Sequence, residues 1–198
     1  MADFSKVEKA LKERGYSVKV FATGAEAAAY LDGEIDGLTV GIGGCSTVKE
    51  LGLYEKLEKH NTVIWHWMQE GADVRKKAMA TDVYLTSANA LAESGEIVNI
   101  DGVGNRVAST LFGHKKVYFI VGRNKLTADY ESAVWRARNV ASPRRAQQMG
   151  CKTPCAEKAD RCYDCRSAGR ICNGMATLWA PMVGMEAEVI LIDEDHGL

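Results

Sequence analysis

Four of the six cysteines have the spacing of a metal site. Cys155, Cys162, Cys165 and Cys172 form the pattern Cys-x6-Cys-x2-Cys-x6-Cys. Thiolates are soft ligands, and four of them can complete a tetrahedral zinc site or ligate the irons of a [4Fe–4S] cluster. The wide outer spacings differ from the short paired knuckles of zinc ribbons, so the pattern favours the cluster over zinc. Cys151 is either a spare thiol or a replacement for one of the four.

The segment that carries these thiols, residues 151–174, has few apolar residues. Such a stretch cannot offset its ordering entropy by burial, so we expect metal–ligand bonds to order it. A return of the chain into the sheet through the final apolar run would bring the segment close to the glycine loop described next. We therefore expect it to fold against the mouth of that loop.

A glycine loop follows the apolar run at 38–43. Gly43 and Gly44 precede Cys45, Ser46 and Thr47, where a helix is predicted to begin. Backbone N–H groups in such a turn can bind an anion, so the two glycines with Ser46 and Thr47 are candidate substrate-binding residues. Cys45 at the helix start is a candidate nucleophile or ligand, or else a small buried residue. A tight turn that binds nothing is the alternative for the loop.

Thr47 and Glu50 have the spacing of a capping box, which places the start of the helix here. The loop lacks both the Gly-Lys-Ser/Thr of a P-loop and the Gly-x-Gly-x-x-Gly of a dinucleotide site.

Polar side chains are dense between residues 86 and 106, although apolar strands flank this stretch. Open α/β sheets bind ligands at such loops, so we predict a general base among Asp101 and Glu93, and substrate contacts from the amides and a basic residue. Turn formation and helix capping are the alternative roles. His66 would lie in a pocket wall or the core. The further candidate substrate-binding residues are Asn89, Asn99, Asn105, Arg106 and, at the end of a later strand, Arg123.

Strand-like and helix-like segments alternate along the chain, which predicts an α/β domain with a mostly parallel sheet and helices on both faces. We expect a single domain over 1–198, with the cysteine segment at 151–174. The predicted helices are one from about Asp3 to Gly15 and those at 25–31, 47–60, 73–80, 103–112 and 127–140. The predicted strands are at 17–21, 38–43, 62–67, 82–88, 96–100, 117–122 and 187–195.

The formal charge of -1 gives no global attraction to nucleic acid or anionic lipid, although a local site for a small anionic substrate remains compatible with it. The sequence has no apolar signal core and no apolar run long enough to span a bilayer. We therefore expect a cytoplasmic protein with no membrane partner, whose clustered thiols are kept reduced.

The motifs GIGGCSTVKELGLYEKL, DVYLTSANALAESGEIVNIDGVGNRVASTLFG, KKVYFIVGRNK and KTPCAEKADRCYDCRSAGRICN together resemble the LUD (lactate utilisation) domain family, in particular its short members with a cysteine-rich tail. The resemblance implies a fold of the NagB, ribose-5-phosphate isomerase and CoA-transferase group. It also implies a role in the oxidation of lactate to pyruvate, with separate iron–sulfur partner subunits. The chain departs from the family pattern at Cys45, where Ser or Thr is usual, and at Cys151, where an apolar residue is common.

Three functions fit these observations. The chain is an iron–sulfur component of lactate or other 2-hydroxy-acid oxidation, or a self-sufficient isomerase, lyase or transferase acting on a small phosphorylated or carboxylated substrate, with Asp101 or Glu93 as the base. The third reading is a ligand-binding module without catalysis that holds structural zinc. A homo-oligomer is compatible with all three.

Overall fold

In this computed structural model, which describes residues 3–198, six strands form one sheet in which every hydrogen-bonded pair is parallel. The strand order is β1-β10-β7-β4-β2-β3, so the last strand of the chain lies inside the sheet, between β1 and β7. The strands are β1 (Ser17–Phe21), β2 (Thr39–Ile42), β3 (Thr62–Trp65), β4 (Val83–Thr86), β7 (Lys116–Gly122) and β10 (Glu186–Ile192).

Each face of this sheet has its own cover. Successive side chains of β7 point to opposite faces, because the side-chain period of a strand is two. Tyr118 and Ile120 pack beneath α2, α3 and α4, whereas Val117 and Phe119 pack with α1 on the other face. The predicted parallel sheet with helices on both faces is confirmed. The helices are α1 (Ser5–Glu13), α2 (Gly24–Glu34), α3 (Ser46–Glu50), α4 (Leu53–Leu57), α5 (Val74–Ala78) and α6 (Asn105–Leu111).

One predicted helix is divided. The pattern at 47–60 predicts a continuous helix, but the structure has α3 and α4 as separate helices. Gly52 lies between them with φ 60°, a left-handed conformation that glycine adopts at little cost and that ends a right-handed helix.

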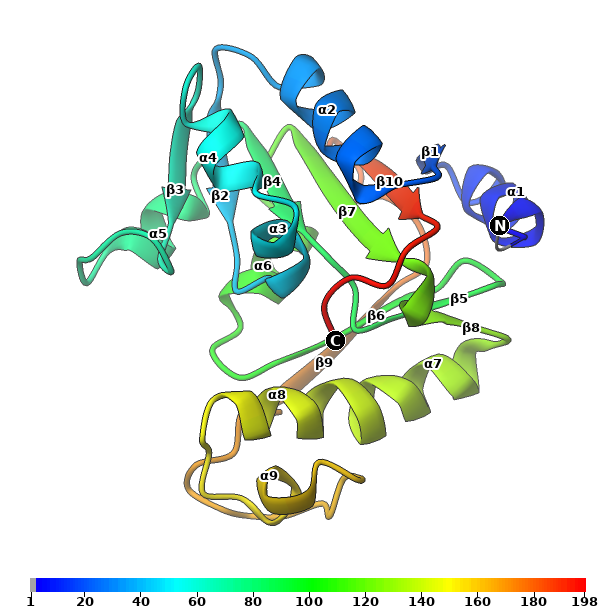
Figure 1. The fold of residues 1–198 in the computed structure, drawn as a ribbon, viewed down its shortest axis with the longest axis vertical. Helices are drawn as coiled ribbons and strands as arrows, with labels where there is room; N and C mark the ends of the chain where they lie inside the picture. Colours follow the sequence, from blue (N-terminus) through cyan, green and yellow to red (C-terminus); the bar gives the residue numbers. More distant parts are fainter. Residues whose placement is uncertain (1–2) are drawn as a thin grey trace.

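A second, smaller sheet lies apart from the first, with the order β8-β5-β6-β9. Ala90 and Ala92 of β5 and Val98 of β6 pack against Ala133 and Ala137 of a long helical rod. Figure 1 shows this rod beneath the second sheet. The rod continues past residue 140, where the sequence pattern predicts its end. The strands are β5 (Ala90–Ala92), β6 (Ile97–Asp101), β8 (Leu126–Thr127) and β9 (Gly174–Leu178), and the rod consists of α7 (Tyr130–Arg136), a π-helical turn η2 (Ala137–Ala141) and α8 (Ser142–Gln148).

The cysteine segment lies on the side of the rod that faces away from the main sheet (Figure 1). It begins with the short helix α9 (Pro154–Lys158), continues without helix or strand over residues 159–173, and ends in β9. The segment therefore joins the second sheet rather than the first. Within the described residues, no helix is long and apolar enough to cross a membrane.

Candidate functional site

A cavity of about 240 Å³ lies between the carboxyl ends of the main strands and the second sheet. Its walls come from the loops after β2, β3, β4 and β7, from β6 and its following loop, and from α8. Open α/β sheets bind ligands at this end of their strands. Eight of the residues predicted from the sequence line the cavity, namely Gly44, Cys45, Ser46, Thr47, Asn89, Asp101, Asn105 and Arg106.

A buried lysine that sequence reasoning missed lies in the cavity wall. After β7 the chain makes the 3-10 turn η1 (Arg123–Lys125), which directs Lys125 inward. Its side chain is 3% exposed, and Nζ donates hydrogen bonds of 2.8 Å to Thr47 Oγ1 and 2.8 Å to Ser87 Oγ. Ser87 was also missed. The available signal was the position of each residue directly after an apolar strand.

Burial lowers the pKa of Lys125 to about 8, because desolvation disfavours the ammonium form. Nearby Arg136 and Arg106 lower the pKa further, while a thiolate at Cys45 would raise it. The charge of Glu50 also raises the pKa of Lys125, by less than burial lowers it. Within the described part of the chain, the hydrogen-bond partners of Nζ are thus two hydroxyl groups.

Arg106 is held by groups of the second sheet and its loops. Nη2 donates to the carbonyl of Ile100 at 2.6 Å and to Asn89 Oδ1 at 3.1 Å. Nη1 donates to Asn99 Oδ1 and to the carbonyl of Ser87 at 3.4 Å. Asn99 is 2% exposed and does not line the cavity, so it positions Arg106 instead of contacting a ligand. These bonds fix a positive charge in the cavity wall.

Asp101 lines the cavity, and one of its oxygens caps a helix. Oδ2 accepts hydrogen bonds of 3.1 Å from the backbone N–H of Arg106 and 3.1 Å from that of Val107, at the start of α6. Such a cap satisfies N–H groups that have no partner within the helix. Asp101 therefore caps α6 through Oδ2, and its other oxygen, Oδ1, is left for a bound molecule.

The glycine loop differs from its predicted form. No capping box forms at α3, because Thr47 Oγ1 accepts from Lys125 and donates to the carbonyl of His196 at 3.3 Å, while Glu50 Oε2 accepts from the N–H of Gly197. Gly43 lies outside the cavity. A Cβ at Gly43 would lie 2.5 Å from the hydroxyl oxygen of Tyr84, so this glycine permits close packing.

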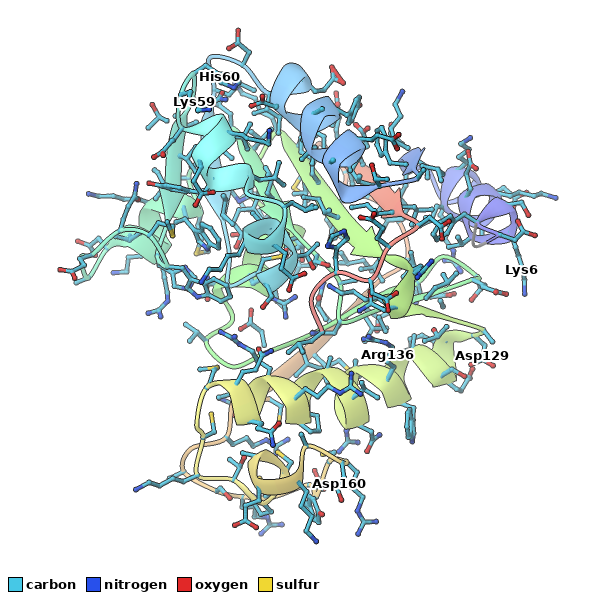
Figure 2. The ribbon with its side chains drawn as sticks, in the orientation of Figure 1. Lys6, Lys59, His60, Asp129, Arg136 and Asp160 are labelled. Carbon is cyan, nitrogen blue, oxygen red and sulfur yellow. The ribbon has the colours of Figure 1, made fainter. Side chains whose placement is uncertain are left out.

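Two predicted site residues, Glu93 and Arg123, lie outside the cavity. Glu93 follows β5 and accepts from Lys6 Nζ at 2.6 Å, and Figure 2 shows Lys6 on the outer helix α1. Arg123 starts the η1 turn and points outward, where it pairs with Asp195 at 3.0 Å and Asp193 at 3.4 Å. These placements put neither side chain in the wall of this cavity, and the roles of Glu93 as a base and of Arg123 as a substrate contact stay predictions.

Two further basic side chains line the cavity, Arg75 and Arg145. The guanidinium of Arg145 lies 4.9 Å from the centre of the Trp67 ring, and burial lowers the pKa of Arg145. His66 is also in the wall. Its Nδ1 is buried without a hydrogen-bond partner, and burial lowers the pKa of His66. This ring favours its neutral form.

The end of the described chain passes over the same site. Residues 193–198 follow β10, and Leu198 lines the cavity. The carbonyl of Gly197 accepts from Asn124 Nδ2 at 3.2 Å, and that of Leu198 accepts from Arg136 Nη1 at 3.5 Å. Figure 2 shows Arg136 on the helical rod opposite this tail.

A second cavity, of about 290 Å³, adjoins the cysteine segment. Cys162 and Cys172 line it together with Arg138 and Arg170. Burial raises the pKa of Cys172, and neighbouring thiolates at Cys162 and Cys165 raise it as well. Ile100 and Ser142 line both cavities, so the two sites share a wall.

The donor types in this segment suit a soft metal, but their positions do not form a ligand set. Among residues 3–198, no three Cys, His, Asp or Glu side chains are grouped so that they could hold a metal ion, and all six cysteines are free thiols. Cys155 lies on α9, and its Sγ is 3.4 Å from Oγ1 of Thr153, the residue before that helix. Ile171 reaches the first cavity, but none of the four thiols lines it. Of the cysteine segment, Ile171 thus reaches the cavity that the glycine loop also lines.

A model of the LUD domain family matches residues 4–192 of the chain. A crystal structure of a DUF162 family protein from Deinococcus radiodurans is similar, with a TM-score of 0.56 and 12% sequence identity over 94% of this chain and 94% of that chain. At that identity the likeness shows the fold alone, and it agrees with the predicted α/β fold. No curated protein matches the chain in sequence. The family match includes every residue predicted for the site.

Proposed function

Because the chain belongs to the LUD domain family, we propose that it acts in lactate utilisation by binding a small carboxylate, a 2-hydroxy acid such as lactate or its 2-oxo product, in the cavity between the two sheets. The family supports the substrate class. The charge and hydrogen-bonding groups of the cavity support the binding site.

The observation that carries the proposal is the excess of positive charge in the cavity wall. Of the described residues that line it, Arg75, Arg106, Arg145 and Lys125 are basic, and Asp101 alone is acidic. The whole chain has a formal charge of -1, so this excess is local. A guanidinium binds a carboxylate through strong, charge-assisted hydrogen bonds.

Arg145 is the best placed of these side chains to hold a carboxylate. Arg106 already donates to four protein oxygens, and Arg75 is exposed. Arg145 is half-buried, rests on the Trp67 ring and has one side-chain hydrogen bond, to Gln148 at 3.2 Å. We therefore assign carboxylate binding to Arg145, and hydroxyl or carbonyl contacts to the group formed by Lys125 and Ser87.

Isothermal titration calorimetry with L-lactate, pyruvate and the uncharged analogue lactamide tests this proposal. We expect both acids to bind and lactamide to bind much more weakly. Arg145→Gln should weaken binding of the acids by about tenfold, which corresponds to about 1.4 kcal/mol. Arg144→Gln is the matched control, because Arg144 is the neighbour of Arg145 in the sequence but is exposed and lies outside the cavity wall. Equal affinity for lactamide and lactate would contradict the proposal.

We propose as a second function that Cys155, Cys162, Cys165 and Cys172 bind an iron–sulfur cluster, which would make the chain an iron–sulfur component of 2-hydroxy-acid oxidation. The wall shared by the two cavities supports this proposal, because it brings the thiol-lined cavity next to the anion site. Residues 159–173 would have to close around the metal, since the thiols are not grouped for it.

Anaerobic purification followed by iron, sulfide and zinc analysis tests the second proposal. About four irons with equivalent sulfide per chain would support the cluster. One zinc per chain would indicate a structural metal instead. The double variant Cys162→Ser/Cys165→Ser should release the metal and make residues 150–175 sensitive to protease, whereas Cys151→Ser serves as the control. Purified chain without bound metal, or full metal content in the double variant, would exclude this ligand set.

A further inference from the structure

We propose that Lys125 is a nucleophilic amine that forms an imine with the carbonyl carbon of a 2-oxo acid bound in the cavity. This inference rests on the proposed function for the class of substrate. It adds a covalent step and assigns that step to one residue.

The two hydrogen bonds that Nζ donates are compatible with its neutral amine form. A neutral lysine has two N–H bonds and one lone pair, whereas an ammonium has three N–H bonds. Nζ donates to Thr47 Oγ1 and to Ser87 Oγ, both at 2.8 Å. Thr47 donates its own hydroxyl proton to the carbonyl of His196, so its oxygen is free to accept from the lysine. In the neutral amine these two donated bonds use both N–H groups, which leaves the lone pair of Nζ for an electrophile in the cavity.

The surroundings of Lys125 raise the fraction of its neutral amine form. The side chain is 3% exposed, donates its hydrogen bonds to two hydroxyl groups, and lies near Arg106 and Arg136, whose charges lower its pKa, while Glu50 raises it by less than burial lowers it. A lowering of the pKa from 10.5 to about 8 raises the neutral fraction at pH 7 by about two orders of magnitude. Only the neutral form is nucleophilic, so Lys125 should react far faster than a surface lysine.

A purely structural role explains the lysine less well. Burying an ionisable amine destabilises the fold, and an apolar residue of similar length would avoid that cost. Such a cost is usual where a group does chemistry. Lys125 also lines a cavity with a cationic wall, which is where a 2-oxo acid would place its carbonyl carbon if Arg145 held its carboxylate.

The proposed step balances without an external oxidant or reductant. The lone pair of Nζ attacks the carbonyl carbon, and the carbon–oxygen π electrons move to oxygen. A proton transferred from nitrogen to that oxygen gives the neutral carbinolamine. Loss of the hydroxyl with a second proton from nitrogen releases one water and leaves the C=N bond. Ser87 and Thr47 are within hydrogen-bond distance of the nitrogen that loses these protons.

Trapping with sodium cyanoborohydride tests the inference on the full chain. The chain is incubated with pyruvate and the reductant, and intact mass and peptide mapping locate any carboxyethyl group. We expect one group per chain, on Lys125, formed about a hundredfold faster than on exposed lysines. Lys125→Met should remove this adduct. Lys9→Met should retain it, because Lys9 lies on the outer helix α1 with a side chain that is 77% exposed.

The outcomes separate this inference from the proposed function. Calorimetry shows whether pyruvate binds, and trapping shows whether it becomes covalent. If pyruvate binds but only exposed lysines are labelled, the imine is refuted and the binding function stands. If pyruvate neither binds nor labels Lys125, both proposals fail. Mapping of the unsubstituted chain gives this answer even if Lys125→Met does not fold.

Discussion

Replacing Lys125 by Met removes a buried ammonium, and the effect on stability should depend strongly on pH. The pKa of Lys125 is lowered from 10.5 to about 8 in the folded chain. The unfolded state therefore binds the proton more strongly, and stability rises with pH between these two values. Below about pH 8 the buried ammonium lowers the free energy of unfolding of the native chain by its full amount. At about 1.4 kcal/mol per pKa unit, this amount is about 3 kcal/mol.

The substitution also removes two hydrogen bonds, to Thr47 and Ser87, each worth about 1 kcal/mol. At pH 7 these losses largely offset the gain, so a single measurement says little. The native and variant chains are therefore compared at pH 7 and at pH 10. The loss of the two hydrogen bonds contributes equally at both pH values, so it cancels when the two comparisons are subtracted. The free-energy difference, variant minus native, should therefore fall by about 2 to 3 kcal/mol between pH 7 and pH 10.

Urea unfolding followed by tryptophan fluorescence measures this difference at both pH values. Lys9→Met, on the exposed surface of α1, is the control and should show no such change. A difference between Lys125→Met and the native chain that is the same at pH 7 and pH 10 would refute the reasoning. It would mean that the ammonium of Lys125 is not penalised by its surroundings.

Three further substitutions, one of them with a matched control, test local features of the fold by urea unfolding. Gly43→Ala should lower the free energy of unfolding by about 1 to 3 kcal/mol, because the new Cβ would lie 2.5 Å from Tyr84 Oη. In the control Gly33→Ala, on α2, the new Cβ meets nothing within 4 Å, so the free energy of unfolding should be unchanged or rise by up to about 1 kcal/mol. Equal effects of the two substitutions would contradict the packing argument. Asp101→Ala should cost about 1 kcal/mol through loss of the cap on α6, and an unchanged midpoint would rule out that cap. Hydrogen bonds to Asp32 and Asp36 raise the pKa of His60, which is labelled in Figure 2. His60→Gln should therefore destabilise the chain below pH 6.5, and this effect should disappear as the pH rises through the pKa of His60 in the folded chain. An effect that is independent of pH would count against the ion pairs.

The main sheet could be predicted because its signals are local. Runs such as VYFIVG are apolar at every position, which is typical of strands buried on both faces of a parallel sheet, and β7 is buried on both faces. The second sheet gives no such signal. β8 has two residues and β5 has three. These short segments form strands because folding places Leu126 of β8 beside Leu91 of β5, about 35 residues earlier in the chain.

The candidate site was predicted in part for the same reason. Polar loops after strands identified Thr47, Asn89, Asp101 and Arg106, because these loops must meet at one edge of the sheet. The side chain of Thr47 was nevertheless misassigned. Its spacing to Glu50 predicts a cap, but Lys125, distant in sequence, takes the hydroxyl instead. A local pattern cannot report a partner that only folding supplies.

The sequence by itself determined the fold class, the family and the chemical types available, because these follow from local periodicity and from residue identity. Only the tertiary structure decided which side chains meet. Arg123 and Lys125 are both basic and lie in the same turn, yet Arg123 points to solvent and Lys125 to the cavity. The 3-10 turn η1 separates them, because it holds Arg123 at the surface and Lys125 in the cavity wall. The four thiols likewise have a clear sequence pattern, but their positions depend on the rod, on β9 and on any metal that residues 159–173 enclose.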